Sequence, residues 1–74
     1  MKITKIYDSF TERTIAGIYE YYVRKENAVD YEDFRTAILA GDVRFKYIGI
    51  YYIASLVKSK SGVICGHKIV KEEN

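Results

Sequence analysis

Six basic side chains and no acidic one lie between residues 43 and 71, around the most apolar and aromatic stretch of the chain. They are Arg44, Lys46, Lys58, Lys60, Lys68 and Lys71. Lysine and arginine neutralise phosphates, and exposed tyrosines such as Tyr51 and Tyr52 stack on single-stranded bases. The first 42 residues carry six basic and eight acidic side chains, so the surplus of positive charge is confined to the C-terminal part. This asymmetry favours an anionic partner for residues 43–71.

The same residues also have a purely structural explanation. Lysine on an edge strand prevents pairing with other chains, and the tyrosines would then belong to the core. A net charge of +2 is small for a nucleic-acid-binding domain. The sequence is compatible with both a surface that binds an anionic partner and a purely structural role of these residues.

Cys65 and His67 are the other residues whose types could do chemistry. They are two residues apart and would share one side of a strand. A structural zinc site needs four ligands, and the chain has no further cysteine or histidine. A catalytic pair would need the thiol to face the imidazole near an oxyanion site, which neighbours on a strand rarely supply. We therefore predict a buried thiol and a surface histidine, with no metal site and no cofactor.

The acidic residues and glycines show no catalytic pattern. Glu32 and Asp33 are adjacent and are explained by the start of a helix. Gly62 and Gly66 lack the strand–loop–helix context of a phosphate-binding loop. We assign no catalytic residue and predict that the protein is not an enzyme.

A first helix is predicted to begin at Ser9, whose hydroxyl would form a capping box with Glu12. An apolar stripe at helical spacing follows and is expected to enter the core: Ile15, Ile18, Tyr19, Tyr22 and Val23. Tyr21 and Gly17 fall together outside this stripe.

A second helix is predicted from about Tyr31 to Ala40, with Asp30 as its N-cap and Gly41 as a left-handed C-cap. Leu39 points away from its apolar face. Tyrosine is enriched in protein interfaces, so Tyr21, Gly17 and Leu39 are the candidate residues for contact with a protein partner.

The remaining segments are predicted as strands. Residues 1–7 form a short strand, and residues 43–57 form a long one in which Gly49 marks a bulge. A helix within residues 47–57 is the alternative there, above all over residues 54–57. After the polar turn at residues 58–62, residues 63–70 return as a strand that completes a long hairpin.

These elements predict a single small α+β domain over residues 1–74, in the order β-α-α-β-β. Two helices would pack on a three-stranded, mainly antiparallel sheet. A single cysteine excludes an internal disulfide, and we expect neither a signal peptide nor a membrane span. The expected location is the cytoplasm, with a homo-oligomer left open.

The run from Phe34 to Lys46, a helix that ends in Ala-Ile-Leu-Ala-Gly and a basic strand, loosely resembles the helix-to-hairpin passage of small Cro-type phage repressors. Those proteins also begin with a short strand. This chain departs from them because one long first helix stands where they carry a compact helix–turn–helix.

The sequence therefore favours a small binding or regulatory protein that engages DNA, RNA or a nucleoprotein complex through its basic hairpin. The residues that would carry this contact are Arg44, Lys46, Lys58, Lys60, Lys68, Tyr51 and Tyr52. The alternative is a protein-interaction module, such as an inhibitor or adaptor of the kind that phages and mobile elements encode. Such a module would dock through a helix face or a sheet edge.

Overall fold

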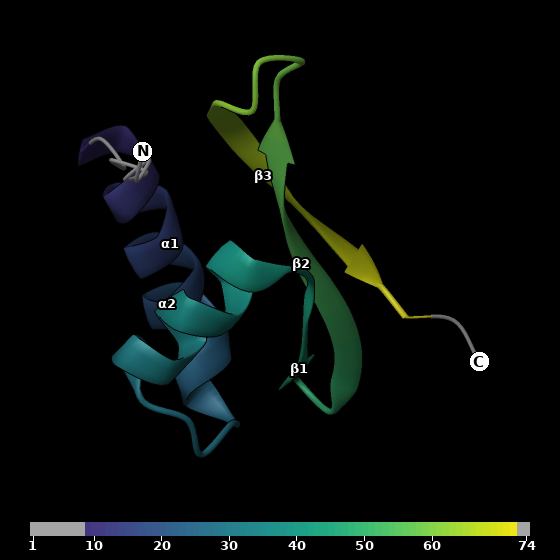
Figure 1. Cartoon of the computed structure of the whole chain (residues 1–74). Helices are drawn as coiled ribbons and strands as arrows, with labels where there is room; N and C mark the ends of the chain where they lie inside the picture. The colour runs from purple at the N-terminus through teal and green to yellow at the C-terminus, as the bar shows by residue number, and fades with distance from the viewer. Residues whose placement is uncertain (1–8, 73–74) are drawn as a thin grey trace.

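The computed structural model describes residues 9–72 and arranges them as two helices on one face of a sheet (Figure 1). The elements are α1 (Ser9–Tyr21), η1 (Val23–Lys25), α2 (Tyr31–Ala40), β1 (Val43–Tyr47), β2 (Ile50–Lys58) and β3 (Ile64–Lys71). The strands are antiparallel, in the order β1-β2-β3. The predicted α+β arrangement of two helices and a three-stranded antiparallel sheet is thus confirmed. The strand predicted over residues 1–7 lies outside the described residues.

The apolar stripe of the first helix enters the core as predicted. Ile15, Ile18 and Val23 are buried, although Val23 belongs to η1 because α1 ends at Tyr21. The second helix and the sheet complete this core with Phe34, Ile38, Phe45 and Ala54. Burying a side chain of the size of isoleucine or phenylalanine contributes about 1.5–3 kcal/mol, so this cluster holds the helices on the sheet.

The predicted capping box at the start of α1 is not formed. Ser9 is already helical, and the Glu12 carboxylate accepts hydrogen bonds from Arg35 in α2, including one of 2.6 Å from Nη2. The Tyr31 hydroxyl donates to the same carboxylate over 3.4 Å. The hydrogen bonds from Arg35 lower the pKa of Glu12, whereas burial and the nearby Glu12 charge raise the pKa of Tyr31. Glu12 therefore joins the two helices instead of capping one of them.

The second helix has the predicted bounds and N-cap. The Asp30 carboxylate accepts a hydrogen bond of 2.9 Å from the Asp33 amide. The prediction of a left-handed C-cap is wrong, because Gly41 has a φ of 170°, which is extended backbone. Its amide still donates to the Ala37 carbonyl over 3.0 Å.

The long strand predicted over residues 43–57 is two strands joined by a tight turn. Ile48 and Gly49 form this turn with φ angles of 49° and 73°, and Tyr47 pairs with Ile50 across it. Gly49 thus marks a turn and not a bulge, and residues 54–57 are strand. The bulge lies between β2 and β3, where Gly66 pairs with Val57 and Ile64 pairs with Lys58. Cys65 is its extra residue.

Candidate nucleic-acid interface

The two faces of the sheet differ in what covers them. Directly paired residues project to the same side of an antiparallel sheet, and side chains alternate along each strand. Phe45 and Ala54 face the helices, and so their neighbours in sequence face away from them. We call this opposite side the outer face; it is formed by Arg44, Lys46, Tyr51, Ile53, Ser55, Val57, Lys68 and Val70. No element among residues 9–72 packs against it (Figure 1).

The outer face combines apolar side chains with positive charge. Tyr51 is 40% exposed and Val70 is 51% exposed, although both stand on strands of the sheet. Arg44 and Lys46 flank Tyr51 on the β1 side, and Lys68 lies opposite Ser55 on the β3 side. An apolar patch bordered by cations suits a ligand that has both flat apolar surfaces and negative charge.

Arg44 and Tyr51 form a fixed pair at one end of this face. The guanidinium carbon of Arg44 lies 3.7 Å from the centroid of the Tyr51 ring. Arg44 Nε also donates to Glu72 Oε2 over 2.8 Å, and this hydrogen bond raises the pKa of Arg44. The Glu72 amide donates to the Tyr51 carbonyl over 2.9 Å, which holds the carboxylate beside the pair. The orientation of the guanidinium is thus set before any ligand arrives.

The structure brings together four of the seven residues predicted to contact nucleic acid: Arg44, Lys46, Tyr51 and Lys68. Lys58 lies at the helix-covered side of the end of β2, where it lines a shallow pocket with Leu56, and Lys60 lies in the turn that follows. Tyr52 is also on the helix-covered side, with its ring stacked on Phe45 at a centroid distance of 5.9 Å. Tyr52 therefore belongs to the packing of the helices on the sheet.

The sequence reasoning missed the apolar part of the outer face and its acidic residue. Ile53, Val57 and Val70 were not singled out, and neither was the contact between Glu72 and Arg44. Side chains alternate between the two faces of a sheet along each strand. With a turn placed at Ile48 and Gly49, this alternation would have assigned Tyr51 and Tyr52 to opposite faces. No local signal in the sequence would have found Glu72, because it lies 28 residues from Arg44.

The three residues predicted to contact a protein partner are not all in one place. Tyr21 is 69% exposed and lines a shallow pocket with Gly17 and His67, between α1 and β3. Leu39 is half-buried against the core and lines a different pocket, with Leu56. A partner that contacts Tyr21 and Gly17 would therefore not need Leu39.

Cys65 and His67 do not share one environment. The bulge exposes Cys65, whose thiol donates to the Val57 carbonyl over 3.5 Å, while His67 lies next to α1. The prediction of a buried thiol is wrong, because the extra residue of the bulge turns it outwards. Within residues 9–72, no three His, Cys, Asp or Glu side chains are grouped so that they could hold a metal ion.

Neither helix of the described region has the length and apolar character needed to cross a membrane. Comparison with protein-family models, with curated proteins and with solved structures finds no significant match to this chain.

Proposed function

We propose that this protein is a non-enzymatic binding protein that holds single-stranded nucleic acid, free or within a nucleoprotein complex, on its outer face. The observation that carries the proposal is the uncovered outer face, in which Arg44, Lys46 and Lys68 surround the exposed ring of Tyr51. Glu72 lies beside this face, where its carboxylate accepts a hydrogen bond from Arg44.

Each group on the outer face has a distinct role in this proposal. Lys46 and Lys68 neutralise phosphates, one on each side of the central strand. A base stacks on the Arg44–Tyr51 pair, since both the guanidinium plane and the tyrosine ring accept a flat aromatic partner. Ile53 and Val70 cover the apolar surface of the next nucleotide.

A single strand fits this face better than a duplex does. The bases of a duplex are stacked inside it, so a broad sheet face would meet only phosphates and groove edges. The apolar side chains Tyr51, Ile53 and Val70 would then stay in water or face charged oxygens. In a single strand the bases turn towards these side chains while the phosphates reach the cations.

Fluorescence anisotropy with labelled oligothymidine and oligouridine tests the proposal, with a duplex of mixed sequence for comparison. We expect tighter binding of the single strands. The logarithm of their affinity should fall with the logarithm of salt concentration at a slope near −1.4, because the two lysines that neutralise phosphates contribute about 0.7 each.

A matched pair of charge reversals locates the site. Lys68→Glu, on the outer face, should weaken binding about tenfold at low salt. Lys25→Glu makes the same change of charge on the exposed surface of η1 and should have a much smaller effect. Equal effects of the two variants, preference for the duplex, or no binding at low salt would each overturn the proposal.

A further inference from the structure

We propose that a groove between the free edge of β1 and α2 binds an extended, basic peptide segment of a partner protein, which adds to the sheet as a fourth strand. This site is separate from the outer face and does not depend on the binding of nucleic acid.

The edge of β1 offers backbone groups to such a strand. In the register of the β1–β2 hairpin, Tyr47 and Phe45 exchange hydrogen bonds with β2, so the backbone groups of Lys46 and Arg44 point away from it. The Asn27 side chain confirms this direction, because its amide donates to the Lys46 carbonyl over 2.9 Å and accepts from the Lys46 amide over 3.0 Å. Asn27 thus takes the place of a peptide group of a neighbouring strand.

Arg44 is the next outward-facing residue along this edge. Within residues 9–72, no group hydrogen-bonds its backbone amide or carbonyl on that side. These two groups match the carbonyl and amide that an extended peptide presents.

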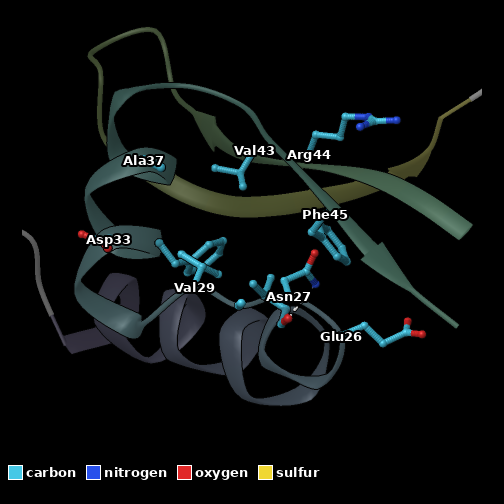
Figure 2. Close-up of a pocket in the computed structure, with 11 residues that line it drawn as sticks. Glu26, Asn27, Val29, Asp33, Ala37, Val43, Arg44 and Phe45 are labelled. Atoms are coloured by element: carbon cyan, nitrogen blue, oxygen red, sulfur yellow. Dashed lines mark hydrogen bonds between the residues drawn. The ribbon is translucent and has the colours of Figure 1, made fainter. Parts of the chain in front are cut away.

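A pocket lies at this place. It has a volume of about 400 Å³ and is lined by residues of η1, the following loop, α2 and β1. Figure 2 shows the Val43 side chain directed into the pocket and the Arg44 side chain directed away from it, so Arg44 contributes its backbone. Together with Val29 and Ala37, Val43 gives the pocket an apolar lining.

The charges around the groove select the kind of peptide. Asp33 and Glu26 belong to its lining and are exposed, and Figure 2 shows their carboxylates at its outer rim. The only cationic residue of the lining is Arg44, whose side chain is turned away. Asp33 forms no ion pair among the described residues. A segment with an apolar residue and, two positions later, a lysine or arginine would place both on the side that faces α2.

The test uses the capped peptide Ser-Val-Thr-Lys-Ser at millimolar concentration and amide NMR spectra of the protein. We expect shifts at the amides of Arg44, Asp33 and Ala37, and slower hydrogen exchange at Arg44. Replacing the peptide lysine with glutamate should weaken binding about threefold to fivefold. Two further versions of the peptide carry N-methyl groups on alternate amides, one on the odd and one on the even positions. One version should lose binding and the other should keep it, because only every second residue of a strand pairs with its neighbour.

Two variants on α2 locate the site. Ala37→Trp should fill the groove and abolish the shifts, whereas Ala40→Trp places the same ring on an exposed position of the same helix and outside the groove. Far-ultraviolet circular dichroism checks that both variants fold, and binding of oligothymidine should be unchanged in both. The proposal is overturned if the Arg44 amide does not respond, or if its response survives Ala37→Trp. It is also overturned if the free protein is a dimer that already protects this amide, since a second copy would then fill the edge.

Discussion

Ile48 has the least favourable backbone conformation of the described residues, because it is a β-branched residue with a φ of 49°. The left-handed region disfavours such side chains by roughly 1–2 kcal/mol. The Ile48 side chain is 72% exposed, so burial does not offset this strain. Two-residue hairpin turns in which both residues have positive φ prefer asparagine followed by glycine.

Ile48→Asn should therefore stabilise the protein, by about 1 kcal/mol. The free energy of unfolding from urea titration measures this change. Ile50→Asn is the matched control, since Ile50 is also an exposed isoleucine but lies in a strand, where asparagine is disfavoured. A loss of stability in Ile48→Asn would contradict the turn geometry.

Glu12 should make the stability of the fold depend on pH. Its pKa is lower in the folded chain, so its contribution is fully present above the ordinary glutamate pKa and is lost as pH falls through the lowered value. Glu12→Gln should destabilise the protein at neutral pH and reduce the loss of stability on acidification. Urea midpoints measured between neutral and acid pH would show both effects.

Glu20→Gln is the control for this pH experiment. Glu20 pairs with Arg24 one helical turn away, on a surface where both side chains are more than half exposed. Glu12, in contrast, joins two helices, and Arg35 is only 32% exposed. If Glu12→Gln and Glu20→Gln change the pH dependence of stability equally, the contact with Arg35 does not lower the pKa of Glu12.

At the scale of elements, Asn27 closes part of the edge of β1 and ties it to η1. Its side chain donates to the Val23 carbonyl over 2.7 Å in addition to the two hydrogen bonds with Lys46. Asn27→Ala should lower the free energy of unfolding by about 1–3 kcal/mol, because it leaves half-buried backbone groups without a partner.

The same variant should increase self-association, since it lengthens the free edge of β1. Sedimentation measures the association, and hydrogen exchange of the Lys46 amide shows whether the edge has opened. Asn27→Asp keeps the acceptor for the Lys46 amide and should slow this exchange relative to Asn27→Ala. A monomer with full stability and unchanged exchange in Asn27→Ala would contradict the role given to this side chain.

The helices could be predicted from the sequence because their signals are local. The spacing of Ile15, Ile18 and Phe34 and the Asp30 cap depend on residues within one or two turns. The turn at Ile48 and Gly49 could not be predicted from the sequence. The apolar pattern runs through it, and isoleucine does not favour the backbone conformation of this turn. One missed turn changed the expected number of strands in residues 43–57.

The candidate site depended on the same turn. Side chains alternate along a strand, so the faces of Tyr51 and Tyr52 follow from where the strand begins. The basic residues were found from composition alone, whereas their division between the outer face and the helix-covered side required the register. The bulge at Cys65 likewise separated it from His67 in a way that spacing did not indicate.

At the scale of the molecule, the unequal distribution of charge along the chain becomes a difference between layers. The acidic residues Glu20, Glu32 and Asp33 belong to the helices on one side of the sheet, and the outer face on the other side carries Arg44, Lys46 and Lys68. Such a separation orients an approaching anion towards the outer face.

Glu72→Gln should strengthen the binding of single-stranded nucleic acid, by about fivefold at most at low salt. The change removes the carboxylate that Arg44 contacts and adds one unit of net positive charge to the outer face. Glu20→Gln changes the net charge equally but acts on α1, and it should alter the affinity less. Equal gains for the two variants would indicate that only the overall charge matters.

Binding of single-stranded nucleic acid to the outer face is tested by an amide NMR titration of the protein with short oligothymidine, with each resonance assigned. We predict that shifts concentrate on the outer face, at Arg44, Tyr51, Ile53, Lys68 and Val70, and disappear as salt is raised. Shifts that fall mainly on α1 and α2, or none on the outer face at low salt, would show that the outer face is not the binding site.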